Sequence, residues 1–143
     1  MDRPVKRRFE ILFGRYTANP MIRGLFKLGI TPPGMALVET IGRRSGAIRH
    51  TPVAYTPGDD DTLWLIAQHG EHAGWVRNFQ ARPQVRVRLG RHWRTGTAEL
   101  LPEDDVKARI RTFSDSAVGR AVTAATFRAL ESQPVTVRIQ LEG

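Results

Sequence analysis

The fold is indicated most directly by the stretch Val85-Arg86-Val87-Arg88-Leu89-Gly90-Arg91-His92. Valine and leucine alternate here with arginine, and this period of two predicts a strand with one buried face and one solvent-exposed face. Gly90-Arg91 suits a two-residue hairpin turn in which glycine takes the first position. The return strand is then expected over residues 92–101. The stretch therefore predicts an antiparallel β-hairpin.

Other segments with strand character lie on both sides of this hairpin. Three precede it, at residues 35–41, 50–56 and 62–67, and one closes the chain at residues 135–141. The segment Pro57-Gly58-Asp59-Asp60-Asp61 joins the second and third of them, and its density of turn-forming residues predicts a second hairpin. Short strands joined by hairpins, with a late closing strand, are typical of a barrel.

Helices are expected around these strands. Val5, Phe9 and Leu12 repeat at helical spacing, and Asn19-Pro20 resembles an N-cap followed by a first-turn proline. Further helices are expected at residues 75–81, from residue 102, and over residues 116–132. The chain is therefore predicted to be mainly β with flanking helices (α+β), as one domain over residues 1–143. Its parts would be a helical segment (1–30), a barrel core (35–101), and helices plus the closing strand (102–143).

Composition excludes several classes of function. The chain has no cysteine, which excludes disulfides, thiolate metal sites and a cysteine nucleophile. No apolar run approaches the roughly 20 residues that span a bilayer, and no signal peptide is recognisable, so a cytoplasmic protein is expected. The four histidines lack the spacing of metal ligands on a helix, so no metal is expected. The net charge of +8 favours an anionic partner.

The loop between the first two strands has the residues of an anion site. Thr40-Ile41-Gly42-Arg43-Arg44-Ser45-Gly46-Ala47-Ile48-Arg49 contains two glycines, which allow close backbone approach, and three arginines, whose guanidinium groups match phosphate or carboxylate. Serine and exposed main-chain N–H groups would complete an anion cradle. The alternative is a solvated hairpin loop with incidental charge. The loop is not a P-loop, because the Gly-Lys-Ser/Thr ending is missing.

The pattern Thr-x-Gly-Arg-Arg-Ser-Gly-x-x-Arg-x-x-Pro, from Thr40 to Pro52, resembles the signature of the deazaflavin-dependent nitroreductase and quinone reductase family. The resemblance continues through residues 65–70 and 75–83. It implies a split β-barrel similar to FMN-binding split barrels. It also implies an oxidoreductase that transfers hydride from reduced coenzyme F-420, a deazaflavin with a phosphate and a polyglutamate tail, to an organic acceptor such as a quinone or nitro compound.

The same resemblance implies a set of coenzyme-binding residues. The phosphate and tail would be held by Arg43, Arg44, Ser45 and Arg49, and the ring system would lie beside Pro52 and Val53. The neighbouring strand end would contribute Ala67, Gln68, His69 and Gly70, and the groove wall would contain Trp75 and Asn78. Better-known members often place serine and lysine where this chain has Gln68 and His69. No catalytic residue is indicated beyond His69, which is a candidate proton donor or a surface histidine without a role.

Several alternatives remain open from sequence. A carrier that binds the coenzyme without turnover would have the same motifs, and FMN is an alternative cofactor. The basic hairpin at residues 86–94 would suit nucleic acid, but exposed aromatic residues for base stacking are scarce there, so nucleic acid is not expected. Arg3, Lys6 and Arg15 accompany an apolar stripe near the N-terminus, which suits either packing on the barrel or contact with an anionic membrane.

Overall fold

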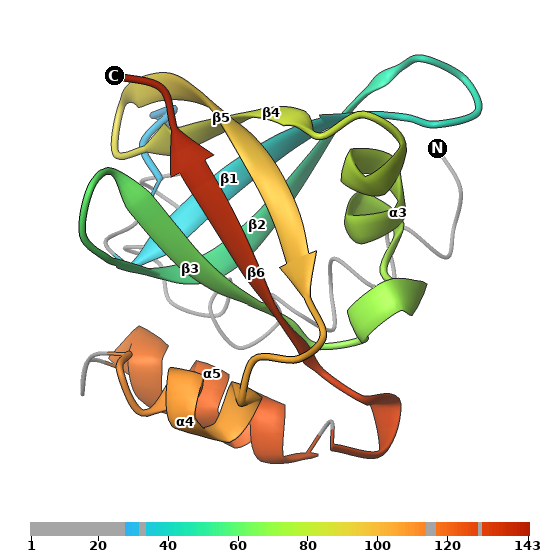
Figure 1. The fold of residues 1–143 in the computed structure, drawn as a ribbon. Helices are drawn as coiled ribbons and strands as arrows, with labels where there is room; N and C mark the ends of the chain where they lie inside the picture. Colours follow the sequence, from blue (N-terminus) through green and yellow to red (C-terminus); the bar gives the residue numbers. More distant parts are fainter. Residues whose placement is uncertain (1–27, 32–33, 114–116, 129) are drawn as a thin grey trace.

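The computed structural model describes residues 28–31, 34–113, 117–128 and 130–143. Its centre is a closed barrel of antiparallel strands in the order β1-β2-β3-β6-β5-β4 (Figure 1). The strands are β1 (Met35–Ile41), β2 (Ile48–Pro57), β3 (Thr62–Ala67), β4 (Gln84–Leu89), β5 (His92–Leu101) and β6 (Val135–Leu141). The predicted mainly-β barrel with flanking helices is confirmed. The predicted N-terminal helices and their membrane contact fall outside the described residues.

Both predicted hairpins are present. Leu89 pairs with His92 across the β4–β5 turn, and Gly90 has the positive φ of 62° that favours glycine there. The β2–β3 turn uses positive φ values at Asp60 and Asp61, which aspartate tolerates better than most residues. β2 is longer than predicted, because its pairing with β1 continues back to Ile48. The helix predicted at residues 75–81 is α3 (Gly74–Ala81).

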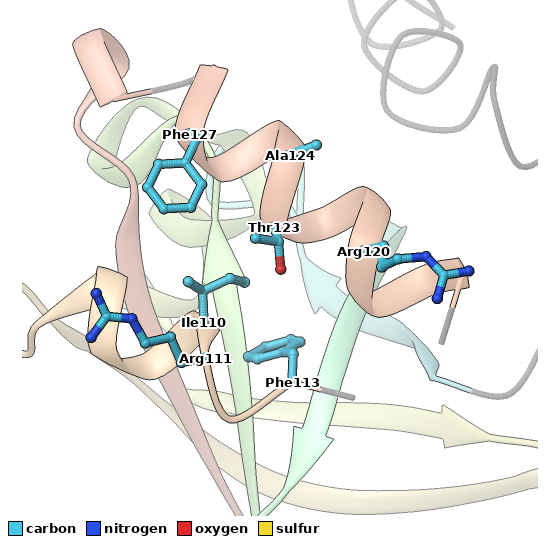
Figure 2. Close-up of a pocket in the computed structure, with 7 residues that line it drawn as sticks. All are labelled: Ile110, Arg111, Phe113, Arg120, Thr123, Ala124 and Phe127. Carbon is cyan, nitrogen blue, oxygen red and sulfur yellow. The ribbon is translucent and has the colours of Figure 1, made fainter. Parts of the chain in front are cut away.

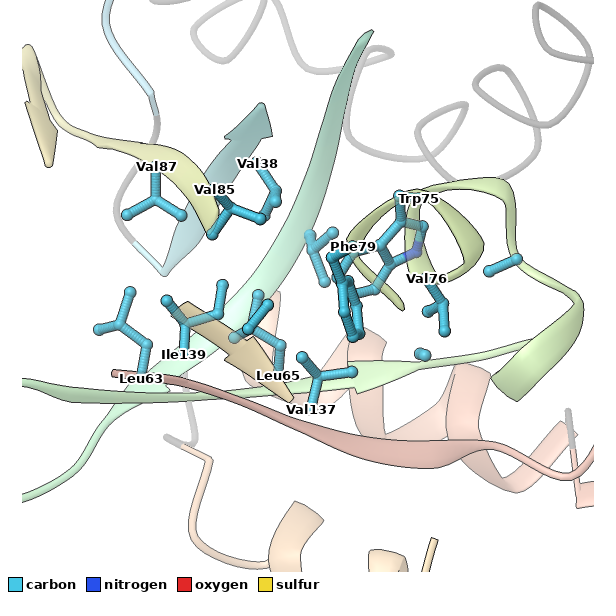
Figure 3. Close-up of a cluster of buried hydrophobic side chains, with 14 of the residues drawn as sticks. Val38, Leu63, Leu65, Trp75, Val76, Phe79, Val85, Val87, Val137 and Ile139 are labelled. Atoms are coloured by element: carbon cyan, nitrogen blue, oxygen red, sulfur yellow. The ribbon is translucent and has the colours of Figure 1, made fainter. Parts of the chain in front are cut away.

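Alternation along the strands produces two separate hydrophobic cores. One fills the barrel, where inward residues such as Val38, Leu65 and Val137 meet (Figure 3). Helix α3 closes this core at one end with Trp75, Val76 and Phe79. Because consecutive strand residues point to opposite faces, each strand that contributes to this core also has an outward face.

The second core lies outside the barrel, beneath the C-terminal helices. Outward residues Met35, Ala54 and Ile66 pack against α4 (Val106–Ile110) and α5 (Ala117–Arg128). The prediction that the first of these helices begins at residue 102 was wrong. Asp105 instead caps α4, accepting from the N–H groups of Lys107 and Ala108 at 3.1 Å. The predicted helix over 116–132 ends at Arg128 and is followed by a 3-10 turn, η2 (Leu130–Ser132).

The barrel is split between β2 and β3. These strands pair only through Tyr55, Thr56 and Pro57, whereas β1 pairs with β2 from Ile48 to Ala54. β3 pairs with β2 no further than Leu65, and after Ala67 the chain turns away into η1 (Gly70–His72) and α3. The edge of β2 over residues 48–54 is therefore not covered by its neighbouring strand. None of the described helices is long and apolar enough to cross a membrane.

Candidate functional site

The arginine-containing loop, residues 42–47, is shaped by its own main chain. The N–H of Gly42 donates to the carbonyl of Ala47 at 2.7 Å, and the N–H of Gly46 donates to the carbonyl of Gly42 at 2.8 Å. Ser45 Oγ accepts from the N–H of Ala47 at 3.1 Å. A Cβ on Gly42 would lie only 3.0 Å from Ser45 Oγ, so a larger residue would distort this loop. Ser45 therefore has a structural role in the loop, beside the anion contact that the motif implies.

One side chain of α3 anchors this loop to the barrel. Asn78 Oδ1 accepts from the main-chain N–H of Arg43 at 3.2 Å and from its Nη1 at 3.0 Å. Asn78 Nδ2 donates to Thr40 Oγ1 at 3.1 Å. Asn78 and Thr40 are both buried, at 5% and 1% exposure. The side-chain oxygen of Asn78 thus positions Arg43, and its amide nitrogen binds Thr40. Thr40 is a supporting residue, and the sequence indicated it only as the first residue of the motif.

The loop presents positive charge without compensation. Arg43, Arg44 and Arg49 are exposed, and none of them forms an ion pair with a carboxylate of the described residues. Several guanidinium groups without a described carboxylate partner, on this loop and at the start of β2, attract a ligand that has more than one negative charge. This arrangement fits the phosphate and carboxylates expected of the ligand.

The open edge of β2 begins at this loop. The N–H of Tyr55 donates to the carbonyl of Gly34, on the β1 side, at 3.0 Å. Since main-chain groups of successive residues point to alternate sides of a strand, those of Ile48, His50, Pro52 and Ala54 face away from β1. Pro52 is tolerated at this edge because no partner strand needs an N–H from it. A flat ligand beside β2 would therefore meet main-chain carbonyl and N–H groups along one side.

Three of the expected coenzyme contacts face inward instead. The side chains of Val53, Ala67 and Trp75 belong to the barrel core and are at most 9% exposed. Pro52 and Val53 are adjacent in a strand, so their side chains point to opposite faces. The main-chain N–H and C=O of Val53 face β1, and Ala67 pairs with Val135 of β6, so neither residue offers hydrogen-bonding groups to the open edge, while Trp75 packs on Phe79 at a ring-centroid distance of 5.6 Å.

The end of β3 continues into the remaining expected contacts. Gln68 Nε2 donates to Thr126 Oγ1 of α5 at 3.1 Å, and its Oε1 is buried without a partner among the described residues. His69 is exposed, and the next residue, Gly70, is buried with a φ of 53°. A Cβ on Gly70 would collide with the carbonyl oxygen of Gln133. Gly70 is therefore required by close backbone packing. Thr126 holds the side chain of Gln68, and the sequence analysis did not predict this contact.

The fold and this site together define a split β-barrel of the kind that binds flavin-type cofactors. Residues 17–142 match the family model described as F-420H(2)-dependent quinone reductase. The chain belongs to this family, and it is an oxidoreductase whose coenzyme is F-420. The resemblance of the Thr40–Pro52 motif to that family is thereby confirmed.

Solved structures support the fold. The chain is similar to the protein Atu2129 of unknown function from Agrobacterium tumefaciens (TM-score 0.59, 19% identity, 76% of this chain) and spans about half of that chain, 48%. It is also similar to an FAD-binding protein from Mesorhizobium loti (0.52, 21% identity, 82% and 87% of the two chains). A third similar structure is an F-420-H2-dependent reductase, FDR-A (0.51, 21% identity, 79% and 97%). No curated protein matches the sequence.

Proposed function

We propose that this protein transfers hydride from reduced coenzyme F-420 to a quinone, with the coenzyme lying along the open edge of β2 and its anionic tail on the arginine loop. The observation that carries this proposal is the junction of two features. Arg43 and Arg44 on a loop held in shape by hydrogen bonds, and Arg49 at the start of β2, are exposed and form no ion pair with a carboxylate of the described residues, and the loop leads directly into a strand edge that β3 does not cover.

The residues around the groove then have distinct roles. Arg43, Arg44 and Arg49 bind the phosphate and tail carboxylates through charge-assisted hydrogen bonds. Asn78 and Thr40 act through Arg43 by fixing its position. Gln68 holds the end of β3 against α5 through its hydrogen bond to Thr126, so this part of the groove wall is positioned without pairing to β2. When bound, the coenzyme supplies a hydride from a ring carbon.

Reduction of a quinone to its hydroquinone needs one hydride and one proton. The hydride would come from the bound reduced coenzyme, which would leave it oxidised, and the proton would come from a group at the groove rim or from water. His69 is exposed and lies between the expected coenzyme contacts Gln68 and Gly70, so it is the candidate for that group. The tyrosines of this chain are Tyr16 and Tyr55, so α5 has no phenol for this step. This favours a quinone over a nitro compound whose reduction depends on such a donor.

The test is single-turnover oxidation of prebound reduced coenzyme by menadione in a stopped-flow instrument. The proposal requires faster oxidation on the protein than in free solution, because the groove aligns donor and acceptor. A nitroaromatic acceptor serves as the comparison and should react more slowly. If the protein slows oxidation by every acceptor, it is a carrier, and if FMN binds as tightly as the deazaflavin in a fluorescence titration, the coenzyme assignment is wrong.

A further inference from the structure

A cavity of about 460 Å³ lies between α4 and α5, outside the barrel. This volume is within the about 300–1,000 Å³ typical of small-molecule sites. The cavity is separate from the arginine loop, which is anchored by α3, whereas α4 and α5 cover another part of the barrel (Figure 1). No step of the proposed reaction uses this cavity.

The interior of the cavity is apolar. Ile110 and Phe113 form its floor and are 1% and 8% exposed, since they also belong to the second core. Phe127 of α5 stands at the cavity with 49% of its surface exposed, and Figure 2 shows its ring on the side of the hollow opposite Phe113. An apolar body placed between these rings would remove both the cavity surface and the exposed phenyl face from water.

The rim of the cavity is positively charged. Arg111 and Arg120 stand at its two ends, and none of the lining residues in the described part of the chain is acidic (Figure 2). Arg111 is exposed and forms no ion pair with a carboxylate of the described residues. A guanidinium group beside an apolar hollow matches a ligand with a lipophilic body and a single anionic head.

We propose that this cavity binds a small lipophilic carboxylate, with its apolar body between Phe113 and Phe127 and its carboxylate on Arg111. Arg111 is exposed and has no carboxylate partner among the described residues, and the cavity volume of about 460 Å³ suits a small molecule with one anionic head. The occupant is therefore a free small molecule.

The test is an NMR titration of the ¹⁵N-labelled full chain with three matched probes: 4-phenylbutyrate, 4-phenyl-1-butanol and 4-phenylbutylamine. They share one apolar body and differ in the charge of the head. The carboxylate should shift the amide signals of α4 and α5 and bind about tenfold more tightly than the alcohol, as expected for a charge-assisted contact. The amine should bind most weakly. Equal binding of all three, or shifts confined to residues 42–49, would overturn the proposal.

Three variants locate the probe. Ala124→Trp fills the cavity from α5 and should abolish the α4 and α5 shifts while the signals of the barrel stay in place. Arg111→Gln should weaken 4-phenylbutyrate about three- to tenfold, because an exposed charge contact is screened by water. Arg128→Gln makes the same charge change on α5 outside the cavity and should have no effect. Unchanged affinity in Arg111→Gln contradicts the proposal. The proposal is also contradicted if 4-phenylbutyrate does not bind to the wild type and Ala124→Trp has an altered sedimentation coefficient, since a second copy of the chain would then cover the cavity.

Discussion

Asn78 accepts two hydrogen bonds from Arg43 on a single side-chain oxygen, one from the main-chain N–H at 3.2 Å and one from the guanidinium group at 3.0 Å. The two residues are 35 positions apart in the chain. Helix α3, which closes the barrel core, therefore also decides where the first arginine of the loop lies. One amide thus links the packing of the barrel core to the position of an arginine in the proposed coenzyme site.

Replacement of Asn78 should disturb the position of Arg43 in the loop more than it disturbs the open edge of β2. Asn78→Ala leaves buried Thr40 without its donor and Arg43 without its acceptor, at a cost of about 1–3 kcal/mol in unfolding free energy. Coenzyme affinity should fall about tenfold, because Arg43 loses its fixed position. Urea unfolding and fluorescence titration measure the two effects. Asn78→Asp keeps an acceptor for Arg43 and should retain more affinity than Asn78→Ala. Gln80→Ala, on the exposed side of α3, is the control and should change neither quantity.

The arginines of the loop should contribute separately to coenzyme binding. Arg43→Ala, Arg44→Ala and Arg49→Ala should each weaken the coenzyme by about ten- to hundredfold, as expected for hydrogen bonds to charged groups. The losses should shrink for a coenzyme fragment that lacks the phosphate and glutamate tail, and they should also shrink at high salt. Arg91→Ala, in the exposed β4–β5 turn, removes the same charge elsewhere. If that control variant loses as much affinity as the loop variants, general charge attraction and not the loop holds the tail.

Gly70 should tolerate no side chain. Its φ of 53° is strained for other residues, and an added Cβ would collide with the carbonyl of Gln133. Gly70→Ala should therefore lower the unfolding free energy by at least about 2 kcal/mol, measured by urea denaturation. Gly74→Ala is the matched control, because nothing lies within 4 Å of a Cβ there and the residue begins α3. That control should be neutral or stabilising by about 0.5–1 kcal/mol. Equal losses in both variants would contradict the role of the Gln133 contact.

The attachment of α4 to the barrel should weaken in acid. Arg109 donates to both carboxylate oxygens of Asp104, at 3.0 and 3.1 Å, and its guanidinium carbon lies 3.7 Å from the centre of a Trp64 ring. The hydrogen bond from Arg109 lowers the pKa of Asp104 below its ordinary value of 3.8. The Asp104 carboxylate therefore binds a proton less readily in the folded state than in the unfolded state. The stabilisation is present above pH 3.8 and is lost as the pH falls through the lowered pKa.

Asp104→Asn tests this relationship. At pH 7 the variant should be less stable than the wild type by about 1 kcal/mol, since both side chains are about one quarter exposed or less. The difference should narrow when urea unfolding is repeated below pH 4. Glu103→Gln removes a neighbouring exposed carboxylate and is the control. The difference in unfolding free energy between this variant and the wild type should not narrow below pH 4. A difference between Asp104→Asn and wild type that stays constant down to pH 3 would show that the ion pair is not its cause.

The strands were largely predictable, because alternation of apolar and polar residues depends only on neighbouring positions. Residues 35–41, 62–67, 92–101 and 135–141 form strands with the predicted bounds. The start of α4 was not predictable in this way. Glu103, Asp104 and Asp105 are all acidic, as is typical of the first turn of a helix. In the structure Asp104 pairs with Arg109 beside Trp64, and only Asp105 caps the helix.

The motif of glycines, serine and arginines could be recognised from the chain alone through its resemblance to the family signature, and the shape of the loop is set by hydrogen bonds within residues 42–47. Its anchorage was not readable, since Thr40, Arg43 and Asn78 meet only when β1 has paired and α3 has closed the barrel. The open edge of β2 likewise depends on where β3 stops pairing with it. Which side chains face the groove and which fill the core follows from the closure of the barrel. That closure joins β3 to β6 and β1 to β4, strands far apart in the sequence.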